Sequence, residues 1–302
     1  MGNIAVDLER ALTRRARLGE PGRTAGRVLA RGEGWVVEDV ICTSGPGDRP
    51  FEEQHHSFSV AVVLTGTFQY RAAAGREVMT PGSVLLGSPG QAFECGHQHG
   101  SGDRCVAFRF SPDRFELLLE ETGVAAPRSR FGALRIPPTR SLAPVVARVG
   151  AGLSRGNLDW EAVAIELAVA AIGGGWEAGA HRSEVPNVAE ARVTQAVRRI
   201  DSDPASQLSL AELAREAGLS RWHFLRAFGR VTGLTPHQYL KRARLRDAAI
   251  RLAIEPAKVI EIAYRSGFGD LSTFNRAFRV EFGASPRAYR GPRVGASSGG
   301  RR

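Results

Sequence analysis

The sequence predicts an α+β fold in which a small N-terminal antiparallel β-barrel precedes an all-helical domain with two helix-turn-helix units. Three observations carry this prediction. Short strand-like runs fill the first third of the chain, a helical pattern occurs twice near the end, and the positive charge is confined to that repeated part. With 302 residues, the chain is long enough for two domains.

Residues 1–30 are polar, rich in arginine and glycine, and lack a regular hydrophobic period, so we expect a flexible arm there. Residues 31–112 then alternate between short apolar runs and turn signals such as Gly45-Pro46-Gly47. The runs expected to form strands are residues 35–41, 58–64, 68–71, 83–86 and 106–110. Many short strands at this spacing are typical of an antiparallel sandwich or small barrel.

Residues 113–186 change to a helical pattern that ends in a linker. A short helix begins near Phe115, and residues 158–172 predict a longer, strongly apolar helix. Gly173-Gly174-Gly175 ends this helix, and the polar stretch up to Asn187 is interpreted as the linker. The apolar helix needs a partner surface, either the barrel or a second subunit. We expect neither a membrane span nor a secretory signal.

Residues 187–291 contain a degenerate repeat, and each copy predicts a helix-turn-helix. The first copy runs from Leu213 to Phe228 and the second from Ile262 to Phe278. The copies are offset by 49 residues up to the turn, at Gly218 and Gly267. After the turn the offset is 50 residues, as in Phe224/Phe274, Arg226/Arg276, Phe228/Phe278, Gly233/Gly283, Pro236/Pro286 and Tyr239/Tyr289. A one-residue insertion in the second turn explains the change, and two such units can read two segments of one DNA groove.

The second helix of each copy has an apolar stripe and an opposite, outer stripe. The apolar stripes hold Phe224, Ala227, Phe228 and Val231, then Phe274, Ala277, Phe278 and Phe282. The outer stripes hold Trp222, Leu225, Arg226 and Gly229, then Ser272, Asn275, Arg276 and Arg279. Arginine suits guanine and asparagine suits adenine in the major groove. The alternative is a pair of ordinary amphipathic helices with solvated arginines.

Residues 238–253 predict a helix of about 24 Å between the two copies. A strut of that length can hold two recognition helices roughly one DNA turn apart, about 34 Å. Residues 188–302 hold 21 Lys and Arg against 10 Asp and Glu, in a chain whose net charge is +10, so the rest is nearly neutral. This favours a polyanion, and double-stranded DNA fits best because a helix cannot enter the narrow major groove of RNA.

Capping residues mark where helices of this domain begin. Asn187 is expected to cap a helix that runs to about Ile200, and Ser209 with Glu212 forms a capping box. Beyond the domain, residues 292–302 are expected to be a disordered tail.

The second copy resembles the signature of the AraC/XylS family of transcriptional regulators. The matching residues are Ile262-Ala263, Gly267-Phe268, Phe274, Arg276, Phe278-Arg279, Gly283, Ser285-Pro286 and Tyr289-Arg290. The resemblance covers residues 188–290. It implies a seven-helix DNA-binding domain, preceded by a cupin-like barrel that senses a ligand or dimerises. By position, it implies base contacts from Trp222, Leu225, Arg226, Leu271, Ser272, Asn275 and Arg276.

Two positions depart from the pattern of that family. Leu225 replaces a residue that is often polar, so it offers only an apolar contact to a thymine methyl group. Gly269 stands where many relatives carry serine. Trp222 is open to two interpretations, a packing residue at the start of the helix or a sugar or base contact beside Arg226.

The predicted barrel contains a cluster of cysteines and histidines whose role stays open at this point. Four of its residues are of the types that bind zinc or another divalent metal, namely Cys95, His97, His99 and Cys105. In a β-run, residues 95, 97 and 99 would project on one face. The usual His-x-His metal pattern of such barrels is absent, since His55 and His56 are adjacent. The alternatives are surface histidines with buried cysteines, and a thiol redox response that includes Cys42.

These observations predict a cytoplasmic, sequence-specific DNA-binding transcription regulator, and more specifically an activator. Its signal, sensed by the barrel, is a small molecule, a metal or a redox change. We expect a homodimer that binds double-stranded DNA and RNA polymerase. Phosphate loops and hydrolase motifs are absent from the sequence, so we expect no enzymatic activity. The alternative is a cupin-type metal-dependent enzyme that carries a DNA-binding domain.

Overall fold

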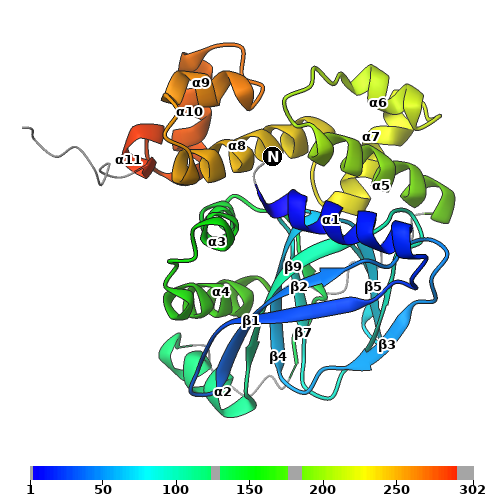
Figure 1. Cartoon of the computed structure of the whole chain (residues 1–302), viewed down its shortest axis with the longest axis vertical. Helices are drawn as coiled ribbons and strands as arrows, with labels where there is room; N and C mark the ends of the chain where they lie inside the picture. The colour runs from blue at the N-terminus through cyan, green and yellow to red at the C-terminus, as the bar shows by residue number, and fades with distance from the viewer. Residues whose placement is uncertain (1–2, 124–129, 176–185, 291–302) are drawn as a thin grey trace, which may run out of the picture.

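The computed structural model of the chain describes residues 3–123, 130–175 and 186–290. Figure 1 shows a sheet-rich half and a helical half that lies against one end of it. The predicted α+β fold is therefore confirmed. The predicted tail, and the part of the predicted linker at residues 176–185, lie outside the described residues.

Two antiparallel sheets form the centre of the N-terminal half. Within the described ranges, the first sheet has the order β1 (Thr24–Gly32), β2 (Trp35–Cys42), β9 (Asp103–Phe110), β4 (Phe58–Gly66), β7 (Val84–Gly87) and β10 (Arg135–Ile136). The second has the order β3 (Phe51–Gln54), β8 (Ala92–Gly96), β5 (Phe68–Ala72) and β6 (Gly75–Met79). No strand pairing among the described residues joins the two sheets, so the predicted barrel is a pair of separate sheets.

The position of strand β4 between two cores explains why its sequence is apolar without interruption. Its side chains alternate between two cores: Val60 and Val62 face one, and Ala61 and Val63 face the other. The second core also takes residues of β5, β8 and β9, such as Tyr70, so it lies between the sheets. A strand that is buried on both faces has no polar side, which is why the alternation expected of a half-exposed strand is missing.

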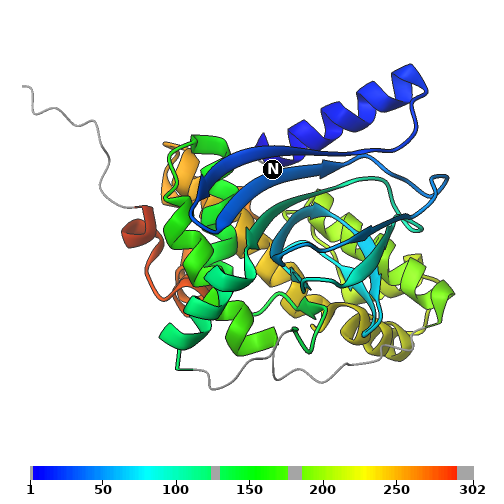
Figure 2. The ribbon, with the colours of Figure 1, turned by 90° about the horizontal axis from the view of Figure 1, so that it is seen from below.

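Three helices cover the other face of the first sheet (Figures 1 and 2). They are α2 (Pro112–Glu121), α3 (Ala143–Arg155) and α4 (Trp160–Gly175). The partner of the predicted apolar helix is therefore the sheet of its own chain: Val163, Leu167 and Ile172 of α4 are buried in the core that β4 shares. Within the described residues, no helix is long and apolar enough to cross a lipid bilayer.

The expectation of a flexible arm at residues 1–30 is wrong. The chain forms α1 (Asn3–Leu18) and then β1. Arg15 of α1 donates from Nη2 to Asp48 Oδ1 at 2.9 Å, and Leu8 is buried. The sequence hides both elements because α1 buries few residues and β1 is a largely exposed edge strand.

The C-terminal half consists of helices alone in the part of the chain that the structure describes. They are α5 (Asn187–Ser202), α6 (Leu210–Glu216), α7 (Arg221–Thr232), α8 (Pro236–Ile254), α9 (Val259–Arg265), α10 (Leu271–Phe282) and α11 (Pro286–Arg290). Helix α8 belongs to two cores, since Tyr239 and Ala243 pack with the first unit and Leu245 and Leu252 pack with the second. It is thus the shared support of both units.

The capping predictions have opposite outcomes. The capping box at α6 is confirmed, because Ser209 Oγ accepts from the Glu212 amide at 3.2 Å and Glu212 Oε2 accepts from the Ser209 amide at 2.9 Å. Asn187 is not a cap: it is the first residue of α5, and its Oδ1 accepts from Arg76 Nη1 of β6 at 3.1 Å. The asparagine therefore joins the two halves of the chain.

Candidate functional site

The predicted recognition helix of the first unit, α7, presents its outer stripe to solvent. Phe224 and Phe228 are completely buried, whereas Trp222 is 60% exposed and Leu225 is 38% exposed. Arg226 is also exposed. The helical spacing alone accounts for this division, because residues three or four apart share one face.

Trp222 is not a packing residue of the core. Its ring lies 5.4 Å from the guanidinium carbon of Arg226, in a cation–π arrangement, and meets the His223 ring edge-on at 5.0 Å between centroids. The arrangement holds the Arg226 side chain along the outer face of α7. Of the two interpretations of Trp222, the exposed position favours the contact role.

Helix α10 repeats this arrangement in the second unit. Phe274 and Phe278 are completely buried, while Ser272, Asn275 and Arg276 are exposed. Leu271, the first residue of the helix, is half-buried and packs at the edge of the core. The structure therefore brings the predicted contact residues of each unit to one surface, with Leu271 at its border.

Both recognition helices start with a side-chain cap directly before these residues. Ser220 Oγ accepts from the His223 amide at 3.3 Å, and Asp270 Oδ1 accepts from the Thr273 amide at 2.7 Å. The backbone hydrogen bond from Thr273 is the main reason that the pKa of Asp270 is lowered. The caps fix where α7 and α10 begin, so the exposed residues of their first turns have defined positions.

Helix α8 sets the distance between the two units. Its 19 residues correspond to about 29 Å, longer than the predicted strut. Figure 1 shows α6 and α7 towards one end of α8 and α9 and α10 at the other. The length of α8 is comparable with the one-turn period of DNA, about 34 Å.

The helical half is fastened to the sheet half by arginines. Arg198 of α5 donates to Thr67 Oγ1 at 3.2 Å and to the Ser101 carbonyl at 2.7 Å. Arg246 of α8 donates to the Pro81 carbonyl at 3.2 Å and to Asp201 Oδ1 at 2.8 Å. The contacts to Thr67, Ser101 and Pro81 join the two halves, whereas the bond to Asp201 links α8 to α5 within the helical half.

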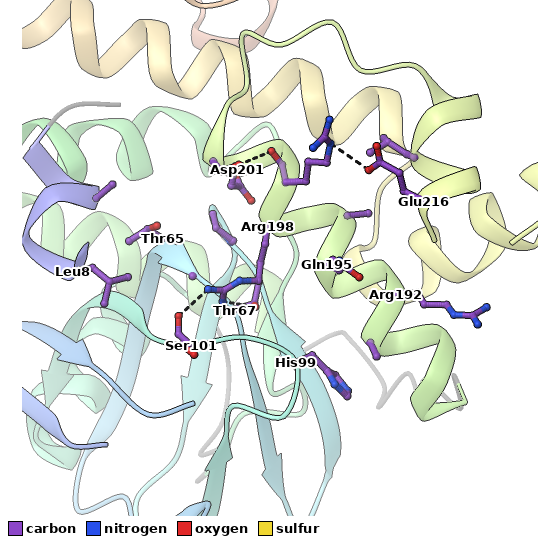
Figure 3. A pocket seen from close by; sticks show the side chains of 18 of the residues that line it. Leu8, Thr65, Thr67, His99, Ser101, Arg192, Gln195, Arg198, Asp201 and Glu216 are labelled. Atoms are coloured by element: carbon purple, nitrogen blue, oxygen red, sulfur yellow. Dashed lines mark hydrogen bonds and ion pairs between the residues drawn. The ribbon is translucent and has the colours of Figure 1, made fainter. Parts of the chain in front are cut away.

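A cleft of about 780 Å³ opens beside these contacts. Figure 3 shows that Leu8 of α1, Thr67 and Ser101 line one side of it, and Gln195 and Arg198 of α5 line the other. The cleft thus lies between the sheet half and the helical half. No sequence pattern predicts it, because its walls come from segments that are far apart in the chain.

The structure does not gather the four predicted metal ligands. Strand β8 ends at Gly96, so the expected alternation stops before His97. Cys95 is buried between the sheets, while His99 lies towards the cleft with its Nε2 4.0 Å from Glu190 Oε1. Cys105 Sγ donates to Asp103 Oδ1 at 3.4 Å.

His97 instead lies with Cys42 and Asp103. One ligand atom from each of these residues lies within 4.8 Å of the other two, and all three side chains are buried. His97 Nε2 and Asp103 Oδ2 are 2.6 Å apart. Burial lowers the pKa of His97, but the bond to Asp103 and the nearby Cys42 outweigh it and raise this pKa to about 9.

The three thiols differ in acidity. Burial raises the pKa of Cys42, but the hydrogen bond and the charge of His97 outweigh it, so the pKa is lowered overall. Burial raises the pKa of Cys95 and of Cys105 well above the usual value. Cys42 is therefore the thiol most easily converted to a thiolate, which is the form that binds metals and reacts.

The adjacent pair His55 and His56 does not join this group. His55 stacks on Phe93 with ring centroids 4.2 Å apart, and its Nε2 lies 2.8 Å from the Tyr70 hydroxyl. Burial and the neighbouring His56 lower the pKa of His55 to about 4. His55 is a neutral packing residue at ordinary pH.

Comparison with known proteins begins with the family model described as "Helix-turn-helix domain", which matches residues 213–291. The transcriptional activator AarP of Providencia stuartii is 32% identical over 91 residues, which cover 30% of this chain and 67% of AarP. The activator RhaS of Salmonella paratyphi B is 28% identical over 250 residues, which cover 80% of this chain and 87% of RhaS. The chain belongs to the AraC/XylS family of transcriptional regulators.

The matches differ in how much of each AraC/XylS relative they include. The match to the TetD protein of transposon Tn10 spans 66% of that protein, and the match to Rob of Salmonella typhimurium spans 29% of Rob. Among solved structures, ToxT from Vibrio cholerae has 14% identity, a TM-score of 0.36, and coverage of 86% of this chain and 98% of ToxT.

The AraC/XylS signature marks the C-terminal half and says nothing of the Cys42, His97 and Asp103 group. Cys42 and Asp103 are direct cross-strand partners, because β2 and β9 pair antiparallel with these two residues opposite each other. The predicted strands end at residue 41 and begin at residue 106, so only their extension in the observed register places Cys42 opposite Asp103. His97 has no such signal, since it follows the end of a strand.

Proposed function

We propose that this AraC/XylS regulator binds two successive segments of double-stranded DNA through α7 and α10 and activates transcription in response to a signal received by its N-terminal half. The observation that carries the proposal is the pair of capped helices with exposed polar stripes, held at the two ends of α8. Cytoplasmic action follows from that role.

The proposed base contacts come from the outer stripes of both helices. They are Trp222, Leu225 and Arg226 in α7, and Leu271, Ser272, Asn275 and Arg276 in α10. The arginines supply bidentate donors for guanine, and Asn275 matches adenine. Leu225 has no polar group, so it contacts a thymine methyl group, and Trp222 contacts a sugar or a base.

The signal reaches DNA through the joint between the two halves. Arg198 and Arg246 link α5 and α8 to the segments at Thr67, Ser101 and Pro81. A ligand that alters those segments changes the position of the first unit relative to the sheet half. The second unit touches the sheet half through α3, whose Ala147 is buried with Leu245 of α8.

A homodimer and contact with RNA polymerase complete the proposal. Exposed apolar side chains on the N-terminal half, such as Val28, Leu117 and Val169, offer surface for a second subunit. Sedimentation of the full chain at micromolar concentration tests the dimer, and a monomer contradicts it. The relatives AarP and RhaS carry the printed name transcriptional activator, which supports activation and gives no support to an enzymatic role.

Mapping of bound sites on chromosomal DNA tests the function. The chain should occupy a small set of discrete sites, and the double variant Arg226→Ala/Arg276→Ala should lose them. The control is Arg49→Ala, which removes an exposed arginine from the sheet half. Retention of all sites by the double variant, or loss of sites in the control, contradicts the proposed interface.

A further inference from the structure

The cluster beneath the loop at residues 97–102 is built from three elements. Cys42 ends β2, Asp103 begins β9, and His97 follows β8. Gly102, in the left-handed conformation with φ of 72°, lets the chain turn back from the loop into β9. A side chain at this position would meet the Cys42 carbonyl at 3.1 Å and Leu8 Cδ1 at 3.0 Å, so the turn is packed closely over the cluster.

We propose that Cys42, His97 and Asp103 bind a thiophilic divalent cation, Zn²⁺, in the interior of the N-terminal half. The three residue types are all zinc ligands, and their ligand atoms already lie within 4.8 Å of one another. Zinc–ligand distances of about 2.0–2.3 Å in a tetrahedron put ligand atoms roughly 3.3–3.7 Å apart. The cluster therefore needs only small side-chain movements to enclose an ion.

The burial of the three side chains is what a metal site inside the protein requires. The exposed fractions of Cys42, His97 and Asp103 are 3%, 5% and 5%. His97 Nδ1 is buried and has no hydrogen-bond partner among the described residues. When Nε2 carries the proton towards Asp103, the unpartnered Nδ1 offers a lone pair, and a metal ion is a group that can accept it.

Charge balance favours the same occupant. Once His97 has released its proton to become a ligand, the Cys42 thiolate and the Asp103 carboxylate carry two negative charges, and one Zn²⁺ makes the buried group neutral. The nearest buried arginine on the strand, Arg104, is already paired with Asp39 at 2.8 Å and with Asp7 at 3.0 Å. Neutralisation within the cluster removes the cost of an uncompensated buried charge.

Cys105 is the nearest further donor. Its Sγ lies 3.4 Å from Asp103 Oδ1, and it shares the face of β9 with Asp103 because the two are two residues apart. Cys95 comes from the second sheet and does not belong to the close group. The site therefore differs from the four ligands that the sequence spacing suggests, and Cys95 and His99 serve as matched controls.

Cobalt titration of the full chain, stripped of metal and kept reduced, tests the site. One Co²⁺ per chain should bind with the charge-transfer absorption of a Co²⁺–thiolate bond. Cys42→Ser should abolish that absorption and Cys95→Ser should retain it. His97→Gln should weaken uptake at least about 100-fold, and His99→Gln should leave uptake unchanged.

Thermal unfolding separates loss of the site from loss of the fold. Saturating Zn²⁺ should raise the unfolding temperature of the chain and of both control variants, because the ion binds the folded state. It should not raise that of Asp103→Asn, which keeps the size of the side chain. The proposal is overturned by absence of stoichiometric uptake, by an unchanged thiolate absorption in Cys42→Ser, or by loss of the absorption in Cys95→Ser.

Discussion

In the unit of α6 and α7, Phe228 packs 5.5 Å from Phe224 and 5.7 Å from Tyr239, measured between ring centroids. In the unit of α9 and α10, Phe278 packs 5.5 Å from Phe274 and 5.3 Å from Tyr289. The interplanar angles of the two pairs differ by no more than 4° from one unit to the other: 52° and 56°, then 78° and 79°. The cores of the two units are therefore copies of each other.

The outer faces of the units are not copies. At equivalent positions α7 has Trp222 and Leu225 where α10 has Ser272 and Asn275. Charge differs as well. Residues 210–232 have four arginines and two glutamates, whereas residues 259–282 have three arginines and three acidic residues. The comparison teaches that the repeated core is a scaffold, on which the outer face of α7 is the more basic and more apolar and that of α10 carries more polar side chains.

The shared core is tested by truncating its central ring in each unit. Phe278→Ala and Phe228→Ala should each lower the free energy of unfolding by about 3–5 kcal/mol, since both rings are fully buried. Urea unfolding of the full chain measures this. The control Ile260→Ala, at a side chain that is 41% exposed, should cost far less. A large difference between the losses of unfolding free energy in Phe228→Ala and Phe278→Ala would contradict the equivalence of the two cores.

The role of the positive charge is tested by measuring how DNA affinity depends on salt concentration. The basic excess on residues 188–302 implies several phosphate contacts, and five of them should lower DNA affinity about 10²–10³-fold between roughly 50 and 200 mM salt. Arg221→Ala and Arg230→Ala both lie in the more basic unit. Each should reduce the slope of log DNA affinity against log salt concentration by about one, without changing sequence preference. A shallow slope for the full chain removes the electrostatic argument.

A buried carboxyl group, Asp201 of α5, accepts hydrogen bonds from Tyr239 and Arg246 of α8, the two residues that also donate to the Pro81 carbonyl of the sheet half. Desolvation raises its pKa to about 6, against the opposing effect of Arg246, Tyr239 and Arg198. Because the pKa in the folded state is raised, the protonated form stabilises the fold, and this stability is lost as the pH rises from about 4 through 6. The loss is at most about 3 kcal/mol.

Asp201→Asn cannot titrate, so its free energy of unfolding should vary less between pH 4 and 7 than that of the parent chain. Unfolding by urea at a series of pH values measures the two profiles. The exposed Asp113→Asn on α2 serves as the control and should leave the profile unchanged. If the free energies of unfolding of Asp201→Asn and of the parent chain change with pH in the same way, the raised pKa of Asp201 is contradicted.

The smallest predicted effects on DNA binding come from the side chains that differ between the outer faces of α7 and α10. Asn275→Ala should cost about 1–3 kcal/mol of DNA binding at one operator position, where adenine is preferred. Leu225→Ala, at the equivalent position of α7, should cost less, because it removes only an apolar contact. Competition binding with single-base operator variants measures both. Equal losses of DNA affinity in Asn275→Ala and Leu225→Ala would contradict the proposed difference between the two outer faces.

The sequence predicted the helical half better than the sheet half, for physical reasons. Each copy of the repeat carries its own period, caps and turn glycine, so local patterns such as Phe224 with Phe228 suffice. Strand β1 and helix α3 were missed. Strand β1 is an exposed edge, and α3 contains Gly150 and Gly152, which weaken its helical pattern.

The site in the sheet half was predicted only in part. His97 was chosen as a ligand from its neighbours in sequence, whereas its neighbours in space are Cys42 and Asp103. Such a group depends on which strands pair and where β8 ends. Neither is encoded in residue spacing, and both are fixed by packing between the sheets.

The most direct test of the central claim is selection of bound sequences from a randomised DNA pool with the full chain, Arg226→Ala and Arg276→Ala. The account predicts that each variant loses preference at a single position, and that the two positions lie about ten base pairs apart, one helical turn. Uniform weakening across all sequences, with no position relaxed, would show that these arginines bind phosphate and that the two units do not read adjacent groove segments.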